Sequence, residues 1–238
     1  MTRISSLNEK LKELVSKHDY HAIYTALLNF CTLELSAFYF DIRKDSLYCD
    51  DIKSIKRRST STCLHIIFEF LTKWLSPIVS FTCEEAWKSR SYSNEESILL
   101  QNVKDDEFTY KDISLEKVFE ELKRVRKSVT SALELKRNEK LIGSSLQAKV
   151  ILFLSKDTQK IIADLDLAEM CIVSNVETHD ISNRSKESIS IDDEEIYVDI
   201  KLADGKKCER CWAVLQEVSS SKNNLCNRCD DVWKTFQK

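Results

Sequence analysis

Apolar residues recur at helical spacing through most of residues 1–140. Leu7, Leu11 and Leu14 stand at positions i, i+4 and i+7, which places them on one face of a helix. A second apolar stripe covers residues 24–38. A third helix is expected from about residue 54 to residue 75, ending before Pro77 because proline cannot continue a helix. The pattern therefore predicts a mainly α N-terminal part.

Polar residues mark further helix ends. Thr82 and Glu85 have the spacing of a capping box and are expected to open a short helix. Ser114 is a suitable N-cap for the long apolar stripe that follows it. Gly143 falls just past that stripe, where we expect it to form a C-terminal cap. Residues 97–100 have weak strand potential.

After Gly143 the pattern changes to short apolar and β-branched runs. The run AKVILFL, residues 148–154, predicts a strand. A short helix is expected over residues 157–165, followed by a second strand over 168–176 and a third strand over 195–202. The acidic run over 177–199 is typical of a solvated loop. A small α/β region is predicted.

Composition narrows the fold classes. The 238 residues are 32% charged and 42% hydrophobic, with only 2 glycines and 1 proline, where average usage gives roughly 17 and 12. This scarcity argues against a turn-rich β-sandwich and excludes a glycine-rich nucleotide-binding loop. A net charge of −3 provides no global attraction to nucleic acid, so binding would need local basic patches.

No membrane segment is predicted. The apolar stretch 64–81 is interrupted by His65, Glu69, Lys73 and Pro77, a spacing typical of one face of an amphipathic helix. The N-terminus is polar and does not resemble a signal peptide. We therefore expect a soluble protein of the cytoplasm, whose nine cysteines are reduced or bind metal.

Four cysteines form the pattern C-x2-C-x14-C-x2-C, in the sequence KCERCWAVLQEVSSSKNNLCNRC. Two such CxxC turns can direct four thiolates at one tetrahedral ion with Zn–S distances of about 2.3 Å. Four thiolates leave no position for water, so the site would be structural and would hold one Zn²⁺. The predicted ligands are Cys208, Cys211, Cys226 and Cys229.

Other interpretations of the cysteines remain open. The pairs could be redox dithiols, an iron–sulfur site or four ordinary cysteines, although the βαβ context of thioredoxin-like motifs is missing. A thiol oxidoreductase is disfavoured because a closed four-thiolate site binds metal. The remaining cysteines show no ligand spacing and are expected to be small buried hydrophobic residues: Cys31, Cys49, Cys63, Cys83 and Cys171.

Basic residues surround the four-cysteine motif. Lys206, Lys207, Arg210 and Arg228 are candidates for RNA contacts, and Trp212 directly follows the first pair. A tryptophan held on a rigid turn beside cations can stack on an unpaired base. The alternative is that the ring forms the core of the small module.

Two further basic groups lie on predicted helices. Lys53, Lys56, Arg57 and Arg58 stand at a helix start, and residues 121–140 carry seven basic against three acidic residues. Such clusters can bind phosphates, but they can equally be solvated helix faces.

Several segments resemble bacterial-type isoleucyl-tRNA synthetase, an isoleucine–tRNA ligase of class I. They are NFCTLELSAFYFDIRKDSLYCD, RRSTSTCLHIIFEFLTKWLSPIVSFTCEEAW, ALELKRNEKLIGSSLQAKV and KCERCW…LCNRC. They occur in the order of that family's C-terminal part. The resemblance implies a helical-bundle anticodon-binding domain over residues 1–142, an α/β junction over 143–203 and a four-cysteine, zinc-ribbon-like module over 204–238.

The resemblance also implies a function. In that family these parts hold the anticodon arm of isoleucine tRNA, and the complete enzyme ligates isoleucine to the tRNA with ATP. The four motif cysteines match the family's zinc ligands, Trp212 matches its tryptophan, and Arg57 and Arg58 match a basic pair. No HIGH or KMSKS sequence occurs in these residues, so no catalytic residue is assigned.

The expected partner is therefore tRNA, with neither DNA nor a membrane, and the expected state is a monomer. The alternative is a zinc-containing protein-interaction module that does not bind RNA. The negative net charge favours that alternative, whereas the ordered matching segments favour tRNA binding.

Overall fold

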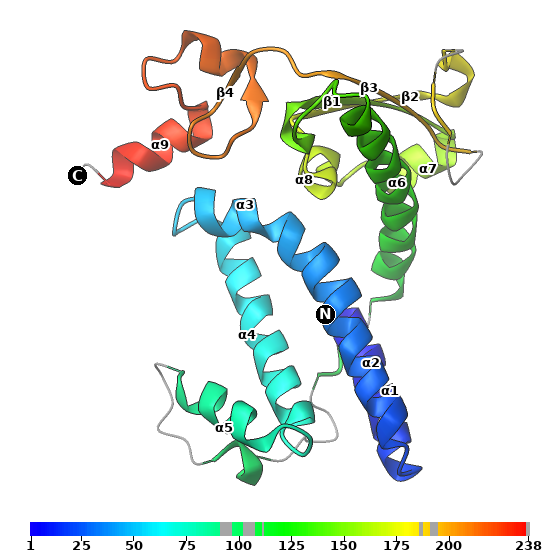
Figure 1. Cartoon of the computed structure of the whole chain (residues 1–238), viewed down its shortest axis with the longest axis vertical. Helices are drawn as coiled ribbons and strands as arrows, with labels where there is room; N and C mark the ends of the chain where they lie inside the picture. The colour runs from blue at the N-terminus through cyan, green and yellow to red at the C-terminus, as the bar shows by residue number, and fades with distance from the viewer. Residues whose placement is uncertain (91–96, 102–107, 111, 186–187, 191–194, 237–238) are drawn as a thin grey trace. The chain divides into compact units, whose positions relative to one another are not determined.

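The computed structural model describes residues 1–90, 97–101, 108–110, 112–185, 188–190 and 195–236 (Figure 1). The chain divides into two compact units. The first unit consists of Met1–Arg43 and Ile52–Ile113, and the second consists of Lys44–Asp51 and Ser114–Lys238.

The first unit is helical over its described residues. One continuous helical stretch leads from Tyr20 to Cys49, and its middle part is a π-helix. The bounds are α1 Thr2–Ser16, α2 Tyr20–Asn29, η1 Phe30–Phe40, α3 Asp41–Cys49, α4 Ile55–Leu75, α5 Ser80–Lys88 and the 3₁₀ turn η2 Ile98–Leu100. The last residues of α3 belong to the second unit.

The core of the first unit joins α1, α2, η1 and α4. Leu11, Leu27 and Phe70 are buried there. The Phe70 ring meets the ring of Phe30 edge to face at 6.1 Å and that of Phe108 at 5.3 Å. Burial of these large side chains is the dominant favourable contribution to stability in this unit. The predicted apolar stripes are therefore core-facing.

The ends of α4 agree with the sequence pattern. The Ser54 side chain accepts a hydrogen bond from the backbone N–H of Arg57 at 3.4 Å. The helix ends at Leu75, before Pro77. Because a serine N-cap and a following proline are local signals, the sequence alone was sufficient for both ends.

The predicted capping box at Thr82 is wrong. Helix α5 begins at Ser80, and Val79 precedes it without a side-chain cap. The Cys83 amide already bonds to the carbonyl oxygen of Val79 at 3.0 Å, so Thr82 lies inside the helix. The weak strand expected at 97–100 is also wrong, because Ser97 caps the 3₁₀ turn η2 by accepting from the Leu99 amide.

By length and hydropathy, one described helical stretch, Tyr20–Cys49, could span a membrane. The same test is passed by core helices of soluble proteins, so a single such stretch is weak support for a span. Ile23, Leu27 and Phe30 of this stretch are buried against α1 and α4. These three residues therefore face the core of the first unit.

The second unit contains a long helix, a three-stranded sheet and a small cysteine-rich module. Strand β1 lies between the other two strands, parallel to β2 and antiparallel to β3. The bounds are α6 Ile113–Asn138, η3 Ser145–Gln147, β1 Ala148–Leu154, α7 Lys156–Ile161, α8 Leu167–Cys171, β2 Asn175–Asp180, η4 Ile181–Asn183 and β3 Tyr197–Leu202. The predicted strand 148–154 is confirmed.

The segment 168–176 is not the strand that its apolar run predicts. It begins as helix α8, which Asp166 caps by accepting from the Glu169 amide at 3.0 Å. Ile172 then adopts a left-handed conformation with φ of 56° and ends the helix. The strand follows as β2, which is more polar than the predicted run. The loop expected over 177–199 therefore begins with residues of this strand. Residues 186–187 and 191–194 of that loop lie outside the described residues.

The ends of α6 also differ from the expectation. Ser114 lies inside the helix, which starts at Ile113. The left-handed residue after the helix is Lys140, with φ of 60°, and the Leu141 amide bonds to the Lys136 carbonyl oxygen at 3.0 Å. This six-to-one bond is a Schellman C-terminus, so Gly143 is not the cap. The division into three domains stays a prediction.

Candidate metal centre and nucleic-acid interface

The first CxxC pair lies at the end of a short hairpin. Strands β4 Lys206–Lys207 and β5 Val214–Leu215 pair in antiparallel fashion. Between them the Cys208 amide bonds to the Ala213 carbonyl oxygen at 2.8 Å, and the Trp212 amide bonds to the Cys208 carbonyl oxygen at 3.0 Å. These bonds close a tight turn that carries both thiols on one side.

The second CxxC pair begins helix α9 Asn227–Phe236. Cys226 precedes the helix, and Cys229 stands in its first turn, where unpaired backbone N–H groups favour negative charge. The 3₁₀ segment η5 Gln216–Ser220 connects the hairpin to this pair and buries Val218. A bond from the Glu209 amide to the Asn224 carbonyl oxygen, at 3.1 Å, ties the two turns together.

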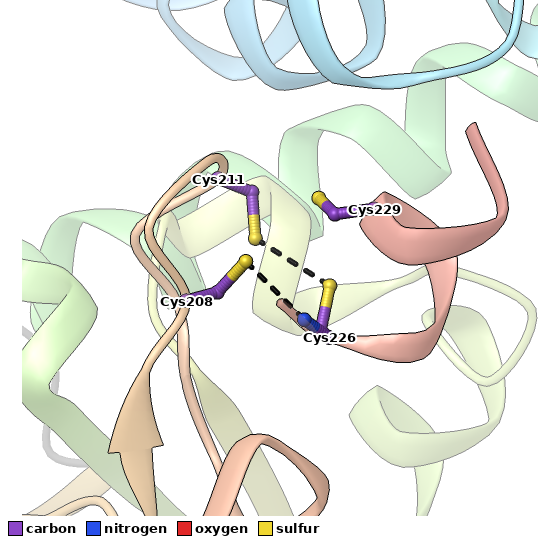
Figure 2. Close-up of side chains that lie close together, drawn as sticks. All are labelled: Cys208, Cys211, Cys226 and Cys229. Atoms are coloured by element: carbon purple, nitrogen blue, oxygen red, sulfur yellow. Dashed lines mark hydrogen bonds between the residues drawn. The ribbon is translucent and has the colours of Figure 1, made fainter. Parts of the chain in front are cut away.

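The four thiols converge on one point (Figure 2). Their sulfur atoms all lie within 4.8 Å of one another. The sulfurs of Cys211 and Cys226 are 3.8 Å apart, and a tetrahedral zinc ion with Zn–S bonds of about 2.3 Å requires sulfurs about 3.8 Å apart. The Cys226 amide also donates to the Cys208 sulfur at 3.3 Å. The geometry and the all-thiol donor set fit Zn²⁺.

Electrostatics explain why a cation is needed. A hydrogen bond with Cys229, together with burial, raises the pKa of the Cys211 thiol to about 12. Burial raises the pKa of the Cys226 thiol to about 11. Four neighbouring thiolates repel one another unless a cation neutralises them, so metal binding and thiol deprotonation are coupled.

Trp212 lies at the surface directly after the first pair. Its side chain is 60% exposed, and the ammonium of Lys207 lies 5.3 Å from the ring centroid. The backbone is left-handed with φ of 68°, a conformation that is costly for a bulky residue and uncommon outside special sites. The exposed ring favours the stacking interpretation over the core interpretation.

Arg210 and Arg228 bind protein groups of the second unit. Arg228 pairs with both carboxylate oxygens of Asp45, one at 2.9 Å, and with Asp50 at 3.1 Å. The hydrogen bonds that the guanidinium donates to Asp45 raise its pKa above the ordinary value. Arg210 donates to the carbonyl oxygens of Tyr48, at 3.0 Å, and Cys49. No pattern in the sequence predicts these contacts.

Cys49 is a fifth cysteine beside the metal centre. It is buried and packs against Cys208, Cys226 and Cys229. Its thiol donates to the Arg210 carbonyl oxygen at 3.9 Å, and a hydrogen bond with Cys229 lowers its pKa. The expectation of a small buried residue is confirmed, but its location is new, because Cys49 has no sequence spacing that relates it to the motif.

The remaining predicted RNA contacts fall into two groups. Lys206 and Lys207 are exposed on β4. Arg57 and Arg58 stand in the first turn of α4, in the first unit, where Arg57 is half-buried and Arg58 is exposed.

On α6, several of the basic residues form ion pairs. Arg124 pairs with Glu121 at 2.7 Å, Lys136 pairs with Glu139 at 2.8 Å, and Arg137 pairs with Glu134. These contacts favour the interpretation that the basic residues of α6 form a solvated helix face and do not bind phosphates.

Residues 1–152 match the family model described as the anticodon-binding domain of tRNA ligase. The chain belongs to this family. Residues 205–232 match a second model, described as the zinc finger found in FPG and IleRS. The anticodon-binding domain and the zinc finger thus account for most of the chain, and a zinc-binding module is confirmed.

Several curated relatives of this chain are isoleucine–tRNA ligases. The chain is 38% identical to that of Gluconobacter oxydans over 97% of its own length and 23% of the relative's. It is 41% identical to that of Pelagibacter ubique over 89% and 22%, and 32% identical to that of Desulforamulus reducens over 97% and 26%. The chain therefore spans about a quarter of the curated relatives' length. The resemblance noted in the sequence is confirmed.

Proposed function

We propose that the chain binds tRNA as the anticodon-arm-holding part of an isoleucine–tRNA ligase. The observation that carries this proposal is the match of residues 1–152 to an anticodon-binding domain, joined to a zinc finger that carries an exposed tryptophan. The relatives are named for ligating isoleucine to tRNA. We propose that the aminoacylation itself, which uses ATP, is performed by the larger remainder of such a ligase.

Within this proposal the four motif cysteines have a structural role. Cys208, Cys211, Cys226 and Cys229 would hold one Zn²⁺, whose chemistry is to bind four thiolates and fix the two turns. Metal binding in such small modules supplies on the order of 10 kcal/mol of folding free energy. A module that buries little apolar surface needs such a contribution.

The proposed RNA contacts follow from exposure and charge. Trp212 would stack on an unpaired base of the anticodon loop, and Lys206 and Lys207 would neutralise phosphates beside it. Arg57 and Arg58 would contact phosphates from the first unit. This binding mode is carried by surface residues, which agrees with the negative net charge of the whole chain.

The test is binding of the purified full chain to isoleucine tRNA and to an unrelated tRNA at several salt concentrations, with zinc measured on the same sample. We expect preferential binding with one zinc per chain. The logarithm of the affinity should fall by roughly 0.7–0.9 per phosphate contact for each tenfold rise in salt. Absent or salt-independent binding by the zinc-loaded chain would overturn the proposal and favour a protein-interaction module.

A further inference from the structure

The two CxxC turns share an arginine at the same place. The turns read C-E-R-C and C-N-R-C, so Arg210 and Arg228 each stand immediately before the second cysteine of a pair. We refer to them as the knuckle arginines. Both side chains contact one short segment, Lys44–Asp51, which is more than 150 residues away in sequence and belongs to the same compact unit.

The contact made by Arg228 has the geometry of a strong ion pair. Its guanidinium binds Asp45 in a bidentate manner and also reaches Asp50. The Asp50 side chain is only 10% exposed. A bidentate arginine–carboxylate pair fixes direction as well as distance, and partial burial reduces screening by salt.

The contact made by Arg210 is to the backbone. Its guanidinium donates to two successive carbonyl oxygens, those of Tyr48 and Cys49, where helix α3 ends. Unpaired carbonyl groups at a helix C-terminus carry partial negative charge and attract a cation. The same Arg210 nitrogen that binds Cys49 lies 3.6 Å from the sulfur of Cys229, so this arginine joins the segment to the metal centre.

We propose that the knuckle arginines are positioning residues that fix the zinc module to the Lys44–Asp51 segment, and that this attachment requires the bound metal. Each arginine follows the backbone of its turn, and binding of one ion by the four cysteines would hold the two turns together more firmly than their backbone hydrogen bonds do alone. Without the ion, the backbone positions from which the two guanidinium groups extend would be held less firmly. In this role neither arginine is a contact to an RNA phosphate.

The attachment is measured by amide hydrogen exchange of residues 44–51 in the full chain. We expect faster exchange there in Arg228→Gln and Arg210→Gln, with zinc still at one per chain, and faster exchange again after zinc chelation of the wild type. Lys206→Gln, an exposed cation of the same module, serves as the matched control and should leave the exchange unchanged. Unchanged exchange in the arginine variants, or after chelation, would overturn the proposal.

A charge exchange tests the pair from both sides. Asp45→Asn leaves the zinc module's sequence untouched and should accelerate exchange in 44–51, but less than Arg228→Gln, which also removes the contact with Asp50. The combination of Arg228→Asp with Asp45→Arg should restore part of the protection that either single change removes. If the double variant is no better protected than the single ones, the two residues do not act as a pair.

The salt dependence of tRNA binding, which rests on the proposed function, separates positioning from phosphate contact. Removing a phosphate contact lowers the slope of log affinity against log salt by roughly 0.7–0.9. We expect that decrease for Lys207→Gln and an unchanged slope for Arg228→Gln. An equal decrease for Arg228→Gln would make it a phosphate ligand and overturn the positioning role. If the wild type binds no tRNA, the proposed function fails, and hydrogen exchange alone still decides the attachment.

Discussion

At the scale of single residues, Trp212 and Gly205 show how the zinc module uses unusual backbone. Both adopt positive φ, 68° at Trp212 and 116° at Gly205. For glycine this conformation costs little, but for tryptophan it is unfavourable. The hydrogen bonds of the first CxxC turn hold Trp212 there, and the ring is left at the surface.

Trp212→Ala is expected to weaken tRNA binding while leaving zinc in place. Stacking of a base on an aromatic side chain contributes about 1–3 kcal/mol, and the exposed ring is not needed to fill the module. Affinity and zinc content should be measured on the same preparation. Trp233→Ala is the control, because Trp233 is also exposed in this module, at 48%. Release of zinc by Trp212→Ala would instead show that the ring packs over the metal centre.

Gly205→Ala is expected to destabilise the zinc module, because a Cβ atom at Gly205 would lie 2.2 Å from the Leu215 carbonyl oxygen. The left-handed backbone adds a cost of about 1–3 kcal/mol. Gly143→Ala is the matched control in the other glycine of the chain, where the nearest atom is a side-chain oxygen at 3.4 Å. Zinc affinity and thermal unfolding should change for Gly205→Ala only, and equal effects would refute the steric argument.

At the scale of elements, helix ends show which local signals were decisive. Ser54 and Pro77 delimit α4 as predicted, because a cap and a proline act on their immediate neighbours. The segment 168–176 was predicted to be a strand but begins as α8. Asp166 and Glu169, three residues apart at its start, are the local signal for the helix. Apolar content alone does not distinguish a short helix from a buried strand.

Glu84 links α5 to the 3₁₀ turn η2 and predicts a dependence on pH. Its carboxylate accepts hydrogen bonds from the Ser97 hydroxyl at 2.7 Å and the Ile98 amide at 2.9 Å. Its ion pair with Lys88 and these bonds lower the pKa of Glu84 below its ordinary value of 4.5. A lowered pKa means that the contribution to stability is present above about pH 4.5 and is lost as pH falls through the folded-state pKa.

This dependence is measured by following amide protection around Ile98 from pH 7 to pH 3. The wild type should lose protection only on the acidic side of pH 4.5, whereas Glu84→Gln should have low protection throughout. Glu85→Gln, on the neighbouring position of the same helix, controls for charge removal. Loss of protection at neutral pH in the wild type would contradict the assignment.

At the scale of the whole molecule, the two units are expected to respond differently to zinc removal. The core of the first unit is made of large apolar side chains such as Phe30 and Phe70, whereas the zinc module has a small core of mostly cysteines. A chelator, or Cys211→Ser, should therefore unfold the module and leave most of the helical circular dichroism signal. Cys31→Ser, in the first unit, is the control. Parallel loss of zinc and of helical signal would mean that the two units fold together.

The sequence by itself determined the helical periodicity, the ends of α4, the strand β1 and the spacing of the two CxxC pairs. All of these are signals between residues a few positions apart, where covalent geometry limits what the chain can do. Several segments resemble those of one family and occur in the same order. This resemblance was also sufficient to indicate the family that the comparisons confirm. The motif cysteines needed only their spacing to indicate a shared metal ion.

The tertiary structure alone decided what surrounds the metal centre. Arg210 and Arg228 contact the Lys44–Asp51 segment, and Cys49 lies beside Cys229. These contacts join residues separated by 161 to 183 positions in the sequence. No local pattern encodes such pairs, because a basic residue between two cysteines suits a phosphate and a carboxylate equally well. The choice between those two ligands depends on which carboxylates the fold brings within hydrogen-bond distance.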